Sequence, residues 1–318
     1  LTQRRFSPNR LLQVGEICAG RNMDEQFAEG SFLGLPDLGG DADILISPVP
    51  YELTTSYGQG TSRGPAACIE ASGQVELFDE LLGEELPAGA VIRTVEPWDG
   101  EGDTLQEQLN GIGKYASKQY SNGGFPIFLG GEHGILPGIL RGCPEKVSLI
   151  QIDAHADLRD ELDGEPYSHA CAIARSLDEG AISVHQVGIR AYCRQEADYI
   201  ENDDRVNTWF ARDVMSPCTG AKAWTEWLEA IAKIDGPVHL TIDIDGLDGS
   251  LVPATGTPVP GGLSFWHVVQ TIETAFANCD IISADVNEIV PEEGTPLTQF
   301  TAAMIATKIA AARIASRR

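Results

Sequence analysis

Short apolar runs alternate with amphipathic stretches from Asp43 onward, and this alternation most constrains the fold. The runs are apolar on both faces, which is typical of parallel strands buried between two layers. They cover residues 44–49, 90–95, 126–130, 147–153, 182–189, 206–210, 238–245 and 280–289. Helices are expected after Glu132, after His169, and over residues 65–82, 104–120, 221–234, 265–277 and 298–314.

This alternation predicts an α/β fold, in which helices cover both faces of a mainly parallel sheet. An eightfold barrel is the alternative architecture, because it uses the same alternation of strand and helix. Residues 1–40 show no sustained period and are interrupted by Gly, Pro and Asn. We expect residues 1–40 to be an N-terminal extension and residues 41–318 to form a single catalytic domain.

The acidic composition excludes several kinds of partner. The chain has a net charge of -25, from 47 acidic and 22 basic residues, which would repel nucleic acid and anionic membrane surfaces. Its seven cysteines are scattered without a C-x-x-C pair, which argues against a disulfide framework. We therefore expect a cytoplasmic protein with no nucleic-acid or membrane partner.

The segment DAHAD follows the run at residues 147–153 and contains Asp153, His155 and Asp157. In an extended chain, side chains two residues apart point the same way, so these three are expected to converge. One Asp at a strand end often only caps the next turn. Three metal-binding residue types in this register favour a metal site.

Two further segments repeat this logic at other strand ends. Asp243 and Asp245 lie two apart in TIDID, and carboxylates held that close repel unless a cation or proton lies between them. His133 ends the segment GGEH, whose two glycines are expected to allow a tight turn over the edge of the sheet. Ligands in open parallel sheets bind beyond the carboxyl ends of the strands, so the three segments are predicted to meet.

Together the segments supply four Asp and two His as candidate ligands: His133, Asp153, His155, Asp157, Asp243 and Asp245. This oxygen-rich set suits divalent first-row ions and fits poorly with a structural zinc site. Six ligands are too many for one catalytic ion with open positions. The set therefore predicts two metal ions roughly 3.5 to 4 Å apart.

These residues also resemble a known family. The motifs GGEH, DAHAD, SHACAIAR, TIDIDGLDGSLVPATGTPVPGGLS and DVNEIVP are similar, in this order, to those of the arginase/agmatinase (ureohydrolase) family. The resemblance extends from about Pro48 to Thr307. It implies a three-layer α/β/α fold with an eight-stranded parallel sheet, and a dinuclear-metal hydrolase that cleaves a guanidino compound to urea and an amine.

The resemblance also implies roles for individual residues. It makes the six candidate ligands the holders of two Mn²⁺ ions, with Ni²⁺ or Co²⁺ possible because both bind more tightly in the Irving–Williams order. It makes His169 the acid/base residue and Glu288 the carboxylate that binds the guanidinium, while Asp157 would also orient the attacking water. Both assignments suit the chemistry, because His titrates near neutral pH and a carboxylate can hold a guanidinium bidentately. A homohexamer or homotrimer is implied as well.

The features that select the substrate disagree. Ala254 and Gly294 resemble arginases, whereas DAHADLRDELDGEPYSHA resembles agmatinases and lacks the loop that holds an amino acid's carboxylate. Cys193 stands where arginases place an Asp for the α-amino group. The resemblance therefore favours agmatine, cleaved to putrescine and urea. The alternatives are an arginase, a guanidinobutyrase or a guanidine hydrolase, an inert subunit of a hetero-oligomer, and a related deacetylase, which Glu288 disfavours.

The loop after Asp157 bears on the same choice. This loop contains four acids, Asp160, Glu161, Asp163 and Glu165. They either receive the distal ammonium of agmatine or are solvated surface acids without a ligand. Arg159 would instead attract a carboxylate. Gly249 replaces a Pro that is usual in the family, which puts the shape of its loop in doubt.

Overall fold

A single open sheet lies at the centre of the computed structural model, which describes residues 30–37, 39–100 and 102–318. Its strand order is β4-β1-β5-β10-β9-β6-β7-β8, and every pair is parallel. The strands are β1 (Ile44–Val49), β4 (Ile92–Thr94), β5 (Phe125–Gly130), β6 (Ser148–Ile152), β7 (Val184–Ile189), β8 (Val206–Phe210), β9 (Pro237–Asp243) and β10 (Asp280–Asn287). The order ends at β4 and β8, so the predicted eight-stranded parallel sheet is confirmed and the barrel alternative is wrong.

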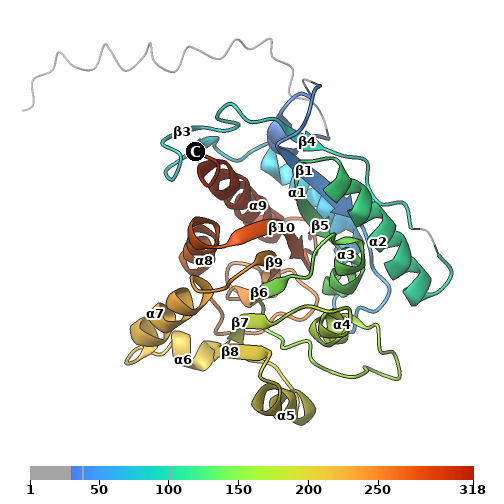
Figure 1. The fold of residues 1–318 in the computed structure, drawn as a ribbon, viewed down its shortest axis with the longest axis vertical. Coiled ribbons are helices and arrows are strands. Elements are labelled where there is room, and N and C mark those ends of the chain that lie inside the picture. Colours follow the sequence, from blue (N-terminus) through green and yellow to red (C-terminus); the bar gives the residue numbers. More distant parts are fainter. Residues whose placement is uncertain (1–29, 38, 101) are drawn as a thin grey trace, which may run out of the picture.

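Helices cover both faces of this sheet, as predicted (Figure 1). One layer contains α1 (Gly64–Ser72), α7 (Gly220–Ile231), α8 (Phe265–Asn278) and α9 (Leu297–Ala315), which pack in one large apolar core. The other layer contains α2 (Leu105–Ser121), α3 (Leu136–Gly142) and α4 (Ala172–Asp178), which pack in two smaller cores. The shorter helices are α5 (Arg194–Asn202) and α6 (Ala211–Val214). The three-layer α/β/α fold is therefore confirmed.

The structure differs from the sequence prediction in one long helix and in several short elements. The helix expected over residues 65–82 ends at Ser72 and is followed by a hairpin of β2 (Phe78–Asp79) and β3 (Glu84–Glu85). The carboxylate of Asp79 accepts the N–H groups of Leu81 and Leu82, a local turn that competes with helix. Helices α5 and α6 were not predicted, because both are short.

The expected N-terminal extension lies mostly outside the described residues. Its described end contains a short 3-10 turn, η2 (Phe32–Gly34), in which Phe32 and Leu33 are buried. The Phe32 N–H donates to Thr94 Oγ1 and the Leu33 N–H to Ser72 Oγ. No helix among the described residues combines the length and apolar character needed to cross a bilayer.

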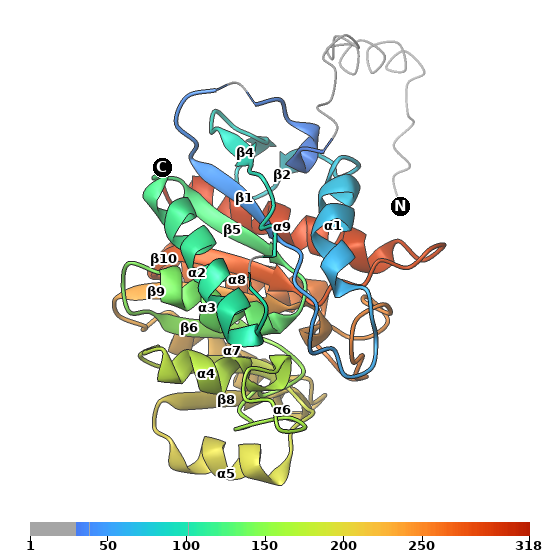
Figure 2. The same ribbon diagram turned by 90° about the vertical axis from the view of Figure 1, so that its right-hand side faces the viewer.

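Helices α2 and α3 pack unusually closely over the sheet (Figure 2). Helix α2 begins at a capping box, in which Thr104 Oγ1 accepts the Glu107 N–H and the Glu107 carboxylate accepts the Thr104 N–H. A Cβ atom added to Gly142 in α3 would lie 2.2 Å from the Gly113 carbonyl oxygen in α2. The close approach of the two backbones therefore requires a residue without a side chain at position 142.

Replacement of Gly142 by alanine should destabilise the protein. We expect Gly142→Ala to lower the free energy of unfolding by about 1–3 kcal/mol, because the added methyl group must push the two helices apart. Urea denaturation followed by circular dichroism measures this change. The control is Gly249→Ala, where an added Cβ meets nothing within 4 Å. Equal stability of the two variants would contradict the close packing of α2 and α3.

Candidate metal centre and active site

The six predicted ligands lie at the carboxyl ends of three strands. His133 follows β5 in the 3-10 turn η4 (His133–Ile135), and Asp153, His155 and Asp157 follow β6. The last two ligands lie at the end of β9, Asp243 as its final residue and Asp245 in η6 (Ile244–Gly246). These strands lie next to β10 or to each other in the sheet. The fold therefore brings the three segments to one edge, as predicted.

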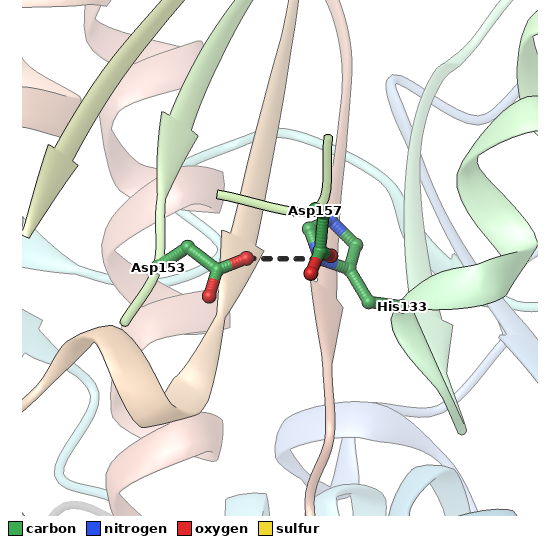
Figure 3. Close-up of side chains that lie close together, drawn as sticks. All are labelled: His133, Asp153 and Asp157. Atoms are coloured by element: carbon green, nitrogen blue, oxygen red, sulfur yellow. Dashed lines mark ion pairs between the residues drawn. The ribbon is translucent and has the colours of Figure 1, made fainter. Parts of the chain in front are cut away.

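A first group of side chains surrounds the imidazole of His133. Its Nδ1 atom lies 3.1 Å from Asp153 Oδ2, 3.1 Å from Asp157 Oδ2 and 3.8 Å from Asp243 Oδ2. The side chain of His133, from the segment after β5, and those of Asp153 and Asp157, from the segment after β6, point toward one another (Figure 3). All four residues are buried.

A second group lies on the other side of Asp153. His155 Nδ1 is 3.0 Å from Asp245 Oδ2 and 3.7 Å from Asp153 Oδ1. One group of three consists of His133, Asp153 and Asp157, and the other of His155, Asp153 and Asp245. In each group, one ligand atom of each residue lies within 4.8 Å of those of the other two. Asp153 belongs to both groups, so the structure contains two adjoining arrangements of metal-binding side chains.

The sequence argument for this convergence was only partly right. Strand β6 ends at Ile152, so the DAHAD segment is not extended throughout. Asp157 has a φ of 53°, in the left-handed region, and its carbonyl oxygen accepts the N–H groups of Ile173 and Ala174 at the start of α4. This turn directs Asp157 toward His133, while His155 faces Asp245.

Gly131 in GGEH also acts differently from the expectation of a tight turn. Its φ is not positive, but an added Cβ atom would lie 1.8 Å from the carbonyl oxygen of Tyr51. The glycine is therefore required for the close approach of two backbone segments, which fixes the direction of the chain just before His133.

Burial and mutual repulsion perturb the acids of the cluster. Burial, together with the charge of Asp153, raises the pKa of Asp157 to about 7. Burial and the charge of Asp245 raise the pKa of Asp243 well above its usual range. Burial alone would lower the pKa of His155, but its contacts with Asp153 and Asp245 raise it to about 11. The protein atoms alone therefore leave an excess of negative charge, which protons or cations must balance.

Contacts behind His133 fix its ring. His133 Nε2 lies 2.8 Å from Thr241 Oγ1, and the Thr241 hydroxyl donates to Asp285 Oδ1 at 2.7 Å. The one proton of the Thr241 hydroxyl is used on a carboxylate, which only accepts, so its oxygen must accept a proton from Nε2. In the neutral ring, Nδ1 then presents its lone pair to Asp153 and Asp157.

Glu288 follows β10 and faces the same place from another strand. Its Oε1 accepts the backbone N–H of His133 at 2.8 Å. It has a φ of 63°, held by its N–H bond to Gly131 O and by the Thr255 hydroxyl, which donates to its carbonyl oxygen. Burial, followed by the charge of Glu132, raises the pKa of the Glu288 carboxyl well above its usual range.

His169 begins the 3-10 turn η5 (His169–Cys171) and is partly buried. Its Nδ1 lies 3.2 Å from Thr54 Oγ1. Burial, and then the charge of His155, lower the pKa of His169 to about 4. Its ring therefore favours the neutral form.

One cavity of about 510 Å³ joins these side chains and opens to solvent. His169 and Glu288 line it together with five of the six predicted ligands, all except the fully buried Asp153. The outer wall includes Arg159, Tyr192 and Cys193. The structure therefore brings every predicted site residue to one pocket or directly beneath it.

Two carboxylates at this site were not predicted. Glu132 is fully buried beside His133 and accepts hydrogen bonds from the segment after β1. Glu196 lines the cavity and caps α5, accepting the N–H of Cys193 at 2.7 Å. A capping Glu three residues after Cys193 was the available signal for Glu196. The four acids of the predicted loop, Asp160, Glu161, Asp163 and Glu165, are not among the residues that line this cavity.

The three other histidines and two of the tryptophans near them have structural roles. His239 is buried and bonded to Ser283 and Asp285, His185 stacks on Trp209, and His267 completes the cap of α8. Trp224 and Trp227 pack in the large core.

Comparisons with known proteins agree with the geometry. The Arginase family matches residues 42–312. The chain is 35% identical over 283 residues to the N(1)-aminopropylagmatine ureohydrolase of Synechocystis sp., covering 85% of this chain and 88% of that protein. It is 31% identical over 280 residues to the agmatinase of Bacillus anthracis, covering 84% and 90%. The solved structure of the agmatine ureohydrolase of Thermoplasma volcanium matches with a TM-score of 0.74 and 27% identity, covering 88% of this chain and 93% of that one.

The matched residues include every side chain of the metal centre and the cavity named above. The resemblance drawn from the motifs is thereby confirmed, and with it the prediction of a hydrolase of the ureohydrolase type. The chain belongs to the arginase family.

Proposed function

We propose that the chain cleaves a decarboxylated guanidino compound to urea and an amine with the help of two bound divalent cations. The observation that carries this proposal is the pair of adjoining side-chain groups that share Asp153. The six residues that would hold the cations are His133, Asp153, His155, Asp157, Asp243 and Asp245. Mn²⁺ suits such an oxygen-rich set, and Ni²⁺ or Co²⁺ could replace it.

The state of His133 supports the fit of cations to these residues. Its Nδ1 is buried without a hydrogen-bond partner, while its Nε2 bonds to Thr241. Burial would lower the pKa of His133, but its contacts with Asp153 and Asp157, both at 3.1 Å, raise it well above its usual range and favour a protonated ring. A divalent cation among these atoms would take the place of that proton and be coordinated by Nδ1 and the carboxylates, and the Thr241 and Asp285 contacts would orient the ligand nitrogen.

The residues of the cavity account for the remaining chemistry. A bound pair of such cations lowers the pKa of water from about 15.7 toward 7 and thus supplies a nucleophile at neutral pH. Glu288 holds the guanidinium of the substrate, since its carboxylate faces the cavity beside the metal centre. Asp157 accepts a hydrogen bond from the attacking water, and His169 passes a proton to the leaving amine.

Agmatine is the substrate that we propose first, because this chain lacks the residues with which arginases hold an α-amino acid. The second candidate is N(1)-aminopropylagmatine. It is favoured by the 35% identity to the Synechocystis relative named for that substrate. A cavity of about 510 Å³ also leaves room for a longer amine.

The proposal also covers the domain organisation, the assembly and the cellular compartment of the chain. Residues 41–318 act as one catalytic domain, because all site residues follow strands of one sheet. The chain assembles as a homohexamer or homotrimer, which rests on the family resemblance. A reducing cytoplasm is consistent with the six described cysteines, which are all free.

Removal of the shared carboxylate should impair metal binding by both groups. We expect the wild-type chain to retain two ions after loading with Mn²⁺ and gel filtration, and Asp153→Asn to retain fewer, since Asp153 contributes to both groups. Elemental analysis measures the bound metal. Asp203→Asn is the matched control, because that carboxylate pairs with Arg205 and does not line the cavity. Full metal content in Asp153→Asn would contradict the shared site.

A substrate panel tests the proposed reaction. The metal-loaded chain should release urea from agmatine or N(1)-aminopropylagmatine with a kcat/KM at least about 100-fold higher than from arginine, because the carboxylate of arginine would enter an acidic pocket without a partner. Guanidinobutyrate and guanidine complete the panel. Preference for arginine would overturn the choice of substrate class, and absence of urea from all five compounds would overturn the proposed reaction.

Neutralisation of Glu288 should weaken recognition of the guanidinium. We expect Glu288→Gln to lower kcat/KM for the preferred substrate by about 10- to 100-fold, because a charge-assisted hydrogen bond becomes a neutral one. Steady-state urea release measures the change. Metal content, measured in parallel, should equal that of the wild type. Unchanged kcat/KM would remove Glu288 from the substrate site.

A further inference from the structure

Glu132 is the most heavily bonded carboxylate beside the metal centre, and the predicted roles leave it without a function. It is fully buried, and its Oε1 accepts the N–H groups of Leu53, Thr54 and Thr55, the last two at 2.6 and 3.2 Å. Its Oε2 accepts the Thr54 hydroxyl. Burial raises the pKa of the Glu132 carboxyl, and these hydrogen bonds oppose that rise. All four partners donate, which suits an ionised carboxylate, since it can only accept.

The second partner of the Thr54 hydroxyl is His169. Thr54 Oγ1 accepts the backbone N–H of His169 at 3.0 Å and lies 3.2 Å from its ring Nδ1. A threonine hydroxyl has one proton, and Thr54 donates that proton to Glu132. The contact between Thr54 and Nδ1 can therefore be a hydrogen bond only if Nδ1 carries the proton and donates it to Thr54. The other hydroxyl at this nitrogen, Ser168 Oγ, is more distant at 3.5 Å.

The other ring nitrogen of His169 has a different environment. Among the described residues, none forms a hydrogen bond with Nε2, and His169 lines the cavity together with His155 and Glu288. A neutral imidazole has one N–H donor and one acceptor nitrogen. With Nδ1 protonated, Nε2 is the acceptor.

We propose that Glu132 is a positioning residue that, through the hydroxyl of Thr54, holds neutral His169 as the tautomer protonated on Nδ1, so that Nε2 exchanges protons in the cavity. This inference rests on the proposed function, in which His169 transfers a proton. It adds to that function the residues that determine which nitrogen does so. Thr54 contacts both Glu132 and the histidine, and neither Glu132 nor Thr54 is needed as a metal ligand.

A purely structural role is the competing explanation, because Glu132 also anchors the segment at residues 53–55 that forms part of the cavity wall. Loss of that anchor would displace Thr55 and raise KM. Loss of the Thr54 hydroxyl alone leaves the three backbone hydrogen bonds to Glu132 Oε1 in place. Thr54→Val therefore separates the effect on His169 from the effect on the wall.

The experiment compares Thr54→Val, Thr54→Ser and a control in the metal-loaded chain with the preferred guanidino substrate. We expect Thr54→Val to lower kcat by about tenfold or more, as loss of an oriented acid/base group does, with KM within about threefold of wild type. Thr54→Ser keeps the hydroxyl and should keep kcat within about threefold. The control is Ser62→Ala, which removes a hydroxyl that donates to Glu52 in the same loop without contact to His169.

A spectroscopic readout reports the tautomer without activity. The chain is labelled with ¹⁵N-histidine and loaded with diamagnetic Zn²⁺, and the signals lost in His169→Asn identify the ring. Wild type and Thr54→Ser should show Nδ1 of His169 protonated and Nε2 unprotonated, whereas Thr54→Val should lose this preference.

Each outcome decides the proposal. Unchanged kcat in Thr54→Val, an equal loss of kcat in Thr54→Ser, or a protonated Nε2 in neutral wild-type His169 would overturn it. A higher KM with unchanged kcat in Thr54→Val would also overturn the proposal, because it would show that Thr54 only supports the cavity wall. If the wild type releases no urea from any guanidino compound, the proposed function fails, while the ¹⁵N spectrum still tests the tautomer.

Discussion

The structure depends on buried carboxylates that repel one another where parallel strands end. Asp153 and Asp243 lie in the interior beside Asp157 and Asp245, and the two imidazoles of the cluster cannot balance all of this charge. Such a cluster is unstable without added positive charge. The neighbouring strands hold the backbone of these residues in place, and cations bound among the carboxylates would relieve the repulsion.

The order of the strands explains why these residues meet although they are far apart in the sequence. Strand β10 lies between β5 and β9, and β6 lies beyond β9. His133 after β5, Glu288 after β10 and Asp243 at the end of β9 are therefore neighbours. Two of the residues need left-handed backbone to face the site, Asp157 and Glu288. That conformation costs about 1–3 kcal/mol for each residue, and hydrogen bonds from α4 and from Thr255 hold it in place.

The layer architecture and the convergence of the six candidate ligands could be predicted from the sequence, because each leaves a local signal. Strands buried on both faces are continuously apolar, and the candidate ligands follow them within a few residues. The end of α1 and the direction of Asp157 could not be predicted, since they depend on side chain to backbone bonds such as those of Asp79 and on contacts with α4. Glu132 was equally hidden. Its partners, residues 53–55, are nearly 80 positions away, and nothing in GGEH distinguishes an anchoring acid from a solvated one.

The charge of the outer wall bears on the class of substrate. Arg159 raised the possibility of a site for a carboxylate, as a guanidino acid would supply. In the structure its Nε lies 3.7 Å from Glu196 Oε2, and Glu196 is buried whereas Arg159 is about one-third exposed. The positive charge of Arg159 is therefore already balanced by a carboxylate in the same wall. Apart from Arg159, the ionisable side chains that line the cavity are histidines, acids such as Glu288, and the phenol and thiol of Tyr192 and Cys193. An anionic substrate end would have to displace Glu196 from Arg159, whereas a cationic end needs no such rearrangement, and the wall thus favours a decarboxylated guanidino amine.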